Sequence, residues 1–343
     1  MPTELMSLSA VEIAHTLSDA NLPLYRGKQI LRWLHKGAGF EDMVNLPKSL
    51  ITQLSADYIA QSVNISKVFP SHADDTVKFL YQLTDHHCVE GVLIRYRHGN
   101  SLCVSSQVGC RMGCVFCAST FGGNARNLSA GEIIGQIIAV NRFLYPEKGI
   151  NHIDIMGSGE PFDNYGNTVK ALRLLKEEDG LMIGMRNVSL STCGLVPEIY
   201  RFAEEKLPVT LCVSLHAPRD DIRKTLMPAA SRYPIKDILN ACRHYFQITG
   251  RRVIFEYLLI SGVNTSVRHA LDLAEQLRGL SCHVNLISLN PITGLELQPA
   301  SETDIKRFIK TLEQNHVSVT RRRMAGNDIG GACGQLMRST LNN

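Results

Sequence analysis

The chain has 343 residues, more than a usual single domain, although a β/α barrel can hold about 250 residues in one piece. Its 44% hydrophobic and 20% charged residues are typical of a globular protein, which disfavours disorder and coiled coil. The net charge of +4 is too small to indicate a nucleic-acid partner by itself.

The beginning of the chain and its cysteines both bear on the compartment. The first residues, MPTELMSLSA, contain no basic segment followed by an apolar run, so they do not indicate a secretory signal. No stretch reaches the roughly 18 consecutive apolar residues of a membrane-spanning helix. The 10 cysteines are therefore expected to be reduced thiols, metal ligands or catalytic groups. We predict a cytoplasmic protein without a membrane segment.

The N-terminal part has the pattern of helices. Ser9 followed by Glu12 is a capping box, which marks the start of a helix. Helical periodicity recurs twice more, after breaks at Pro23 and Pro47, in residues 29–34 and 50–59. Two β-rich runs follow, residues 77–83 and 89–96, and the polar residues 84–87 between them indicate a hairpin. We predict an N-terminal helical accessory domain with a short β extension over residues 1–92.

From Ser101 onward, strand-like and helix-like segments alternate, which is typical of parallel β/α units. The predicted strands are residues 102–106, 152–156, 188–191, 209–215, 253–259 and 284–289. The predicted helices begin after a second capping box, Ser129 with Glu132, and continue in residues 168–177, 235–247, 267–277 and 302–314. Six units predict an α/β fold with a partial (β/α)6 barrel over residues 93–321, followed by a C-terminal segment, 322–343.

A cysteine motif directly follows the first of these strands. Its spacing is C-x3-C-x2-C, formed by Cys110, Cys114 and Cys117. Three soft thiolates can hold three irons of a [4Fe–4S] cluster and leave the fourth iron open. An open iron can chelate the amino and carboxylate groups of S-adenosylmethionine (SAM). The motif follows the C-terminal end of a barrel strand, where barrel enzymes carry their active sites.

The ends of later strands carry small or polar residues that can complete such a site. The second strand ends in Gly157-Ser158-Gly159-Glu160-Pro161, in which Gly159 permits close backbone approach and Glu160 can accept a hydrogen bond from the SAM amino group. Taken singly, each of these strand ends is a turn or a helix cap. The further candidates for cofactor binding are Ser191, Ser214, His216 and Asn290.

The cysteines of the chain also allow readings other than a cluster. The cysteines can form a structural zinc knuckle in a non-catalytic RNA-binding protein, with His86, His87 or Cys103 as fourth ligand. Cysteines outside the motif can be small buried hydrophobic residues, as we expect for Cys193, Cys212, Cys242 and Cys282.

Charge distribution says more than net charge. Residues 91–130 contain no acid but include Arg95, Arg97, Arg111 and Arg126. Residues 317–343 contain four arginines, at 321, 322, 323 and 338, against the single acid Asp328. Each run alone is more typical of a solvated face than of a phosphate track, but their shared position beside the cysteines makes a solvated face less expected.

At these residues the sequence resembles the RlmN and Cfr methyltransferases of the radical SAM superfamily, with RlmN the more similar group. The likeness extends over nearly the whole chain. It is carried by LCVSSQVGC at residues 102–110, GSGEP at 157–161, LMP at 226–228 and ACGQL at 332–336.

The resemblance implies a substrate and a product. The substrate is an adenosine of 23S ribosomal RNA in the peptidyl transferase centre, with an adenosine beside the tRNA anticodon as the second target. The expected product is 2-methyladenosine, whereas Cfr-type relatives methylate C8 of the same rRNA base. Pro161 after Glu160 agrees with RlmN-type sequences.

The resemblance also implies roles for residues outside the cluster motif. Cys333 takes a methyl group from one SAM, a second SAM yields a 5′-deoxyadenosyl radical, and the methyl carbon then bonds to the base. Cys103 resolves this adduct through a transient Cys103–Cys333 disulfide, and Glu90 accepts the ring proton. From the residues alone, Cys333 is a tail cysteine, Cys103 a core residue and Glu90 an exposed strand residue.

The expected cofactors and partners follow from this chemistry. They are one [4Fe–4S] cluster, two SAM molecules per turnover, 23S rRNA and tRNA, and an electron donor of the flavodoxin or ferredoxin type. The base must leave its stack to reach a buried site, and the helical accessory domain is the candidate RNA clamp. We expect a monomer.

Overall fold

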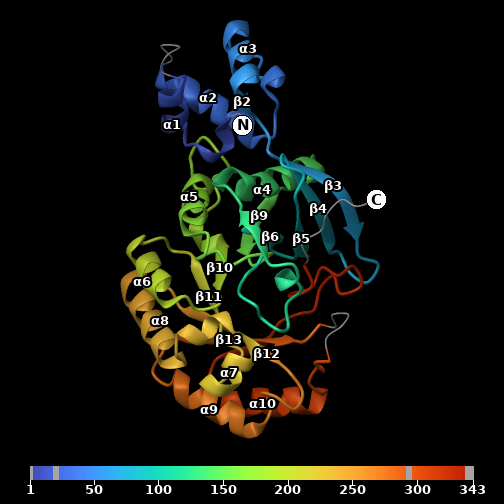
Figure 1. Ribbon diagram of the computed structural model, residues 1–343, viewed down its shortest axis with the longest axis vertical. Helices are drawn as coiled ribbons and strands as arrows, with labels where there is room; N and C mark the ends of the chain where they lie inside the picture. The colour runs from blue at the N-terminus through green and yellow to red at the C-terminus, as the bar shows by residue number, and fades with distance from the viewer. Residues whose placement is uncertain (1–2, 18–22, 291–295, 337–343) are drawn as a thin grey trace.

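A computed structural model describes residues 3–17, 23–290 and 296–336 of the chain (Figure 1). Helices at the N-terminus lie above a large, curved sheet, and further helices cover the outer face of that sheet. The N-terminal elements are β1 (Thr3–Glu4), α1 (Ala10–Thr16), α2 (Leu24–His35), α3 (Lys48–Asp57) and β2 (Tyr58–Ile59), with single 3-10 turns at Leu5–Ser7 and Phe40–Asp42. β1 and β2 pair in parallel.

Local sequence explains where these N-terminal helices begin. The Ser9 hydroxyl oxygen accepts a hydrogen bond from the Glu12 backbone N–H, and the Glu12 carboxylate accepts one from the Ser9 backbone N–H, as the capping box predicts. Pro23 and Pro47 are the N-cap residues of α2 and α3, a position that needs no proline N–H. The predicted helices of this part are therefore confirmed.

The N-terminal helices are docked on the barrel rather than tethered to it. Glu4 accepts hydrogen bonds from Ser62 and Ser129, and Ser129 caps the first barrel helix. Arg32 on α2 binds Asp179 at 2.8 Å through Nε. Buried apolar residues of α1 and α2 belong to the same continuous core as the barrel, among the residues described. The helical part is thus fixed relative to the barrel.

One sheet of ten strands joins the β extension to the barrel. β3 (Val63–Pro70), β4 (Val77–Leu83), β5 (Cys88–Tyr96) and β6 (Gly99–Val104) pair antiparallel in that order. Val92 lies inside β5, which is paired on both edges. The division expected at residue 92 therefore falls within a strand and stays a proposal.

From β6 onward the sheet is parallel and its strands follow chain order. The strands are β9 (Ile150–Ile155), β10 (Val188–Thr192), β11 (Thr210–Ser214), β12 (Val253–Leu259), β13 (Cys282–Ser288) and β14 (Val319–Arg321). Consecutive order with parallel pairing carries the chain around an open, partial barrel. The six barrel strands predicted from sequence are confirmed, and β3 and β14 were missed.

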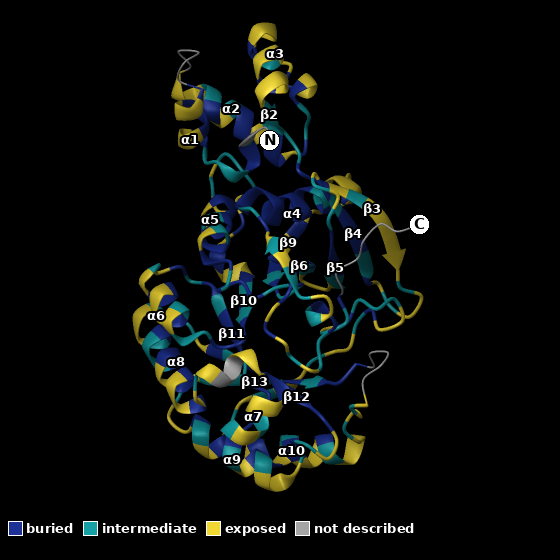
Figure 2. Ribbon diagram, in the orientation of Figure 1, coloured by how far each residue is buried: buried dark blue, intermediate teal, exposed yellow. Residues whose placement is uncertain are grey.

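Helices connect these strands over the outer face of the barrel. They are α4 (Ala130–Leu144), α5 (Tyr165–Leu175), α6 (Val196–Glu204), α7 (Asp220–Leu226), α8 (Ile235–Thr249), α9 (Val267–Leu277) and α10 (Glu302–Gln314), with 3-10 turns at Ala118–Thr120, Met185–Asn187 and Ala229–Arg232. α4 lies beneath the N-terminal helices and is mostly buried, whereas α6, α9 and α10 expose one face (Figure 2). The five predicted barrel helices are confirmed, but α6 and α7 were not predicted.

Burial follows the two periods expected of strands and helices. β12 is almost entirely buried, including Phe255 and Tyr257, whereas β9, β10 and β13 alternate between buried and partly exposed residues. Within the described residues, no helix is both long and apolar enough to cross a membrane.

Candidate active site

The cysteine loop begins where β6 ends, at the carboxyl end of the parallel strands. β7 (Gln107–Gly109) and β8 (Asn124–Asn127) pair antiparallel at its two ends, so the loop leaves and returns at one point. The Val115 N–H donates to the Leu226 carbonyl at 3.0 Å, and the Ala118 N–H donates to the Gly334 carbonyl at 2.7 Å. The loop is therefore held between the end of α7 and the C-terminal segment.

Cys110, Cys114 and Cys117 line one cavity of about 130 Å³, together with Gly159 and Glu160. Burial raises the pKa of all three thiols, and the other two cysteines further raise the pKa of Cys114, so the sulfurs lie within reach of one another. Iron binding needs thiolates, so loading this cavity with a cluster releases protons.

The described residues fit a cluster better than a single ion. Among residues 3–17, 23–290 and 296–336, no set of three or more His, Cys, Asp or Glu side chains surrounds one metal position. A [4Fe–4S] cluster binds each thiolate through a different iron, so its ligands need not converge on one point. The all-thiolate donor set and the shared cavity match that requirement.

The loop after β9 lies against the cysteine loop. Gly159 has φ of 111°, and a Cβ at this position would lie 2.7 Å from the Gln107 Cβ, so only glycine fits. Glu160 Oε1 accepts the Phe162 N–H at 3.0 Å and Oε2 accepts the Cys193 N–H at 2.7 Å. Burial raises the pKa of Glu160, and these bonds oppose it. The Glu160 carboxyl group is thus held by two backbone N–H groups and lines the cluster cavity.

Ser191 near the end of β10, Ser214 at the end of β11 and His216 just after β11 line the same cavity as the cysteines. The His216 Nδ1 accepts the Leu258 N–H at 3.0 Å, so Nε2 carries the ring proton. Burial, with a smaller effect of Arg223, lowers the pKa of His216 to about 3, which keeps the ring neutral at neutral pH. The ring packs edge-on against Phe116 of the cysteine loop.

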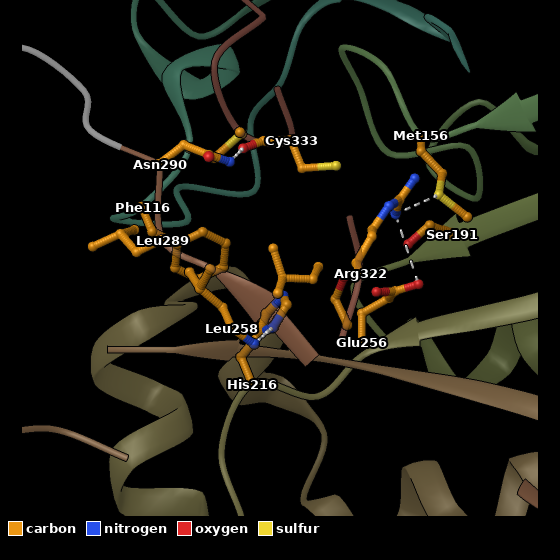
Figure 3. A pocket seen from close by; sticks show the side chains of 14 residues that line it. Phe116, Met156, Ser191, His216, Glu256, Leu258, Leu289, Asn290, Arg322 and Cys333 are labelled. Atoms are coloured by element: carbon orange, nitrogen blue, oxygen red, sulfur yellow. Dashed lines mark hydrogen bonds and ion pairs between the residues drawn. The ribbon is translucent and has the colours of Figure 1, made fainter. Parts of the chain in front are cut away.

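A second cavity adjoins the first and contains Cys333 (Figure 3). The two share Phe116, Cys117, Met156, Ser191, Ser214 and His216. Asn290 donates from Nδ2 to the Cys333 carbonyl at 3.0 Å, while its buried Oδ1 has no hydrogen-bond partner among the described residues. An orphaned buried oxygen beside the cysteines is suited to a polar ligand such as SAM. Pro291, which follows Asn290, lies outside the described residues.

The C-terminal segment carries Cys333 to this cavity by a long route. After β14 it crosses the β3–β4 turn, where Asp328 accepts bonds from the Ser71 hydroxyl (2.7 Å) and the His72 N–H (2.9 Å). It then returns to the cysteine loop, where the Ser119 hydroxyl donates to the Leu336 carbonyl at 2.7 Å. Cys333 is exposed. Arg338 of the predicted basic run lies outside the described residues.

Cys103 lies on β6, partly buried, and pairs with Val92 on one side and Asp154 on the other. Burial raises the pKa of the Cys103 thiol, and the charge of Cys333 is the next cause, so the two thiols lie within range of an electrostatic interaction. The structure therefore brings together two cysteines that are 230 positions apart in the printed sequence.

Glu90 is buried on β5. The sequence alone predicts an exposed strand residue at this position, and that prediction is wrong. It lies two residues from Val92, so Glu90 and Cys103 face the same side of the sheet. Its Oε1 forms an ion pair with Lys78 Nζ at 3.2 Å. Lys78 in turn lies beneath Gly330, three residues before Cys333.

The acid-free run of sequence is not a row of unpaired cations. Arg95 binds Glu147 at 2.6 Å, Arg111 binds Asp163, and Arg126 binds both Asp85 and Glu132. All four acids come from outside residues 91–130. The expectation of a continuous basic phosphate track is therefore weakened, because tertiary structure supplies the missing acids.

The sequence predicts no functional role for three further residues that line the two cavities. Cys193 was expected to be a core residue, and it is buried, but it also lines the cluster cavity. Met156 directly follows β9 and lines both cavities, and its place at a strand end is the sequence signal for it. Glu256 is buried in the middle of β12 and had no sequence signal, because a single acid in an apolar strand predicts nothing about its direction.

Comparisons with known proteins agree with this geometry. Residues 104–274 match the family model of the Radical SAM superfamily. A protein of Clostridium novyi described as a probable dual-specificity RNA methyltransferase RlmN is 45% identical over 321 residues, which are 93% of each chain. One of Desulforamulus reducens with the same description is 46% identical, covering 97% of this chain and 95% of that protein. The crystal structure of a radical SAM methyltransferase from Sphaerobacter thermophilus has a TM-score of 0.94 at 41% identity, covering 98% of this chain and 99% of that one.

The fold and site together define a SAM-dependent methyltransferase of the radical SAM class, with a [4Fe–4S] cluster and SAM as its cofactors. Within that class, the chain belongs to the RlmN family. The predicted α/β barrel and the resemblance are confirmed. The alternative of a non-catalytic metal knuckle is not supported.

Proposed function

We propose that the protein methylates C2 of an adenosine in 23S rRNA, and of the adenosine beside the anticodon in tRNA, using two SAM molecules per turnover. The observation that carries this proposal is the pairing of an exposed Cys333 with Cys103 beside the cavity of Cys110, Cys114 and Cys117. A methyltransferase acting by polar transfer needs no such pair of thiols. Relatives described as dual-specificity RNA methyltransferases support the two RNA substrates.

The proposed chemistry follows from the substrate atom. An aromatic C2–H carbon is not nucleophilic, so it does not attack the methyl group of SAM. When bound, the cluster and SAM supply a 5′-deoxyadenosyl radical. Cys333 is proposed to carry the transferred carbon as S-methylcysteine, and its exposed position on the C-terminal segment gives a bulky base access to it. Asn290 holds the Cys333 backbone in place.

Cys103 is proposed to release the RNA from Cys333. Its sulfur attacks the Cys333 sulfur, the S–CH2 bond breaks with its electron pair on carbon, and that carbon takes a proton to become the methyl group. The thiols are thereby oxidised to a disulfide while the carbon is reduced, so one thiol and one thioether give a disulfide and a methyl group. A reductant must regenerate the thiols.

Replacing Cys103 by alanine is expected to trap RNA on the protein. The carbon carried by Cys333 still bonds to the adenine ring, but the variant has no Cys103 sulfur to attack Cys333 and release the RNA. Denaturing gel electrophoresis of the reaction should show a covalent protein–RNA band that nuclease treatment shortens. Free, fully methylated RNA with no such band would remove Cys103 from the mechanism.

Glu90 is proposed to accept the proton that leaves C2. Its carboxylate lies on the same sheet face as Cys103, with Lys78 beside it. Glu90→Gln keeps the volume and removes the base, so RNA methylation should fall about 10²- to 10⁴-fold, the usual contribution of a general base. Methylation of Cys333, which needs no ring proton, should continue, as mass spectrometry of the protein can show. Equal loss of both steps would indicate a structural role instead.

The RNA must present its base outside the stack, because the cavities lie at the mouth of a barrel. We assign the docked N-terminal helices as the RNA clamp. Flavodoxin or ferredoxin is the proposed electron donor, and we propose a monomer working in the cytoplasm.

The proposal is tested by the position of the new methyl group. Protein prepared without oxygen is incubated with SAM, a reductant, and either 23S rRNA or tRNA, and the digested nucleosides are analysed by mass spectrometry. We expect 2-methyladenosine from both RNAs. 8-Methyladenosine would show Cfr-type regiochemistry, and no methylated adenosine would refute the proposed function.

A further inference from the structure

Arg322 sends its side chain into the barrel, unlike its neighbour Arg321. Arg321 points outward, where it binds Glu302 at 2.7 Å. The backbone N–H of Arg322 donates to the Leu286 carbonyl at 2.8 Å, and its side chain is only 22% exposed. Alternation along an extended segment accounts for the opposite directions of the two side chains.

The Arg322 guanidinium lies among groups at the mouth of the barrel (Figure 3). Its Nη1 is 3.7 Å from the Met156 sulfur and 4.0 Å from Glu256 Oε1. Glu256 is anchored in turn, because Asn285 donates to both of its oxygens at 3.0 and 3.1 Å. The cation thus lies between Met156, which follows β9, and Glu256 on β12.

Cys333 lies next to this cation, and the strand register brings Cys103 close to it. Arg322 lines two cavities together with Cys333, and Figure 3 shows the Cys333 side chain pointing toward it. Cys103 pairs with Asp154 on β9, and Asp154 and Met156 line a further cavity together with Arg322. Burial raises the pKa of Cys103, Cys333 and Asp154 raise it further, and Arg322 is the side chain that lowers it.

We propose that Arg322 is a positioning residue that stabilises the Cys103 thiolate facing Cys333 and so accelerates the attack of Cys103 on the Cys333 sulfur. This inference rests on the proposed function, since it assigns a partner to the step that releases the RNA. A buried thiolate without a cation would be costly, because burial disfavours the charged form. A lysine at this position keeps the charge, and a methionine removes it at similar volume.

The same attack can be measured without RNA or SAM. Oxidised glutathione converts the exposed Cys333 into a mixed disulfide and releases one reduced glutathione. The Cys103 thiolate then attacks the Cys333 sulfur, a new S–S bond forms, and the electron pair of the broken S–S bond leaves with glutathione thiolate. Mass spectrometry of peptides from acid-quenched samples of the oxygen-protected, cluster-loaded protein gives the lifetime of glutathione on Cys333. Cys103→Ala supplies the baseline without attack.

Arg322→Met is expected to lengthen that lifetime roughly tenfold. Losing a nearby cation raises a thiol pKa by about one to three units, and the thiolate that remains is a better nucleophile, which offsets about half of the effect. Arg322→Lys should stay within about threefold of the wild type because it keeps the charge. Arg268→Met, on the exposed side of α9, should match the wild type.

Two results would overturn the proposal. One is release of glutathione at the wild-type rate by Arg322→Met. The other is equal slowing in Arg322→Met and Arg322→Lys together with equally lowered melting temperatures, which would make Arg322 a structural anchor. Because the thiol exchange needs no RNA, its measurement does not depend on whether the proposed RNA chemistry is correct. If Cys103→Ala traps no RNA while Arg322→Met still slows the exchange, the RNA chemistry is wrong and the role of Arg322 stands.

Discussion

Replacing Cys333 by alanine is expected to abolish RNA methylation while iron, sulfide and SAM cleavage remain. Cys333 is exposed on the C-terminal segment, and its Asn290 contact is through the backbone carbonyl, which alanine preserves. The loss is therefore chemical, because the methyl carrier is missing. RNA methylation is measured by mass spectrometry of digested nucleosides, and SAM cleavage by the release of 5′-deoxyadenosine in the presence of reductant.

The matched control is Cys282→Ala. Cys282 is also incompletely buried, but it begins β13, at the end of the strand away from the cysteine loop. This variant should methylate RNA at the wild-type rate. Turnover by Cys333→Ala at that same rate would end the two-step scheme.

Replacing Cys114 by alanine is expected to have the largest effect of these substitutions. The variant should lose bound iron, SAM cleavage and both methyl transfers. Cys114 is the middle thiol of the three that line the cluster cavity. Two thiolates leave the cluster one ligand short, so the purified protein should contain little iron or sulfide. Analysis of both elements in protein prepared without oxygen measures this directly, with Cys282→Ala again as the control.

The two variants separate the cluster from the methyl carrier. Cys333→Ala should keep the cluster and lose only the product, whereas Cys114→Ala should lose both. A wild-type protein that fails to assemble iron and sulfide under these conditions would contradict the assignment of Cys110, Cys114 and Cys117. Full iron content in Cys114→Ala would remove that residue from the ligand set.

Elements with strong local signals were predicted correctly. The capping boxes at Ser9 and Ser129 form as expected, and β12 and α9 have the predicted bounds. The missed helices α6 and α7 are short, at nine and seven residues. Neither N-cap residue bonds to the helix through its side chain, so the usual start signal is missing. Tertiary packing rather than local sequence defines them.

Side-chain environments were predicted less well than elements. Arg111 and Arg126 stand in an acid-free stretch, yet each is paired with an acid from another part of the fold. Glu90 is predicted from sequence to be an exposed strand residue. It is buried because the C-terminal segment covers its face of the sheet. Both differences come from contacts between residues that are far apart in the chain.

The sequence by itself determined the order of the barrel elements, the cysteine motif at the end of β6 and the strand ends that surround it, because each depends on residues within one or two turns of chain. Only the tertiary structure decided that Cys333 comes within electrostatic range of Cys103, and that Arg322 rather than Arg321 lines the cavity of Cys333. Those contacts depend on the path of residues 322–336 across the β3–β4 turn and back to the cysteine loop. Hydrogen bonds between distant segments set that path, and no local pattern in the sequence encodes them.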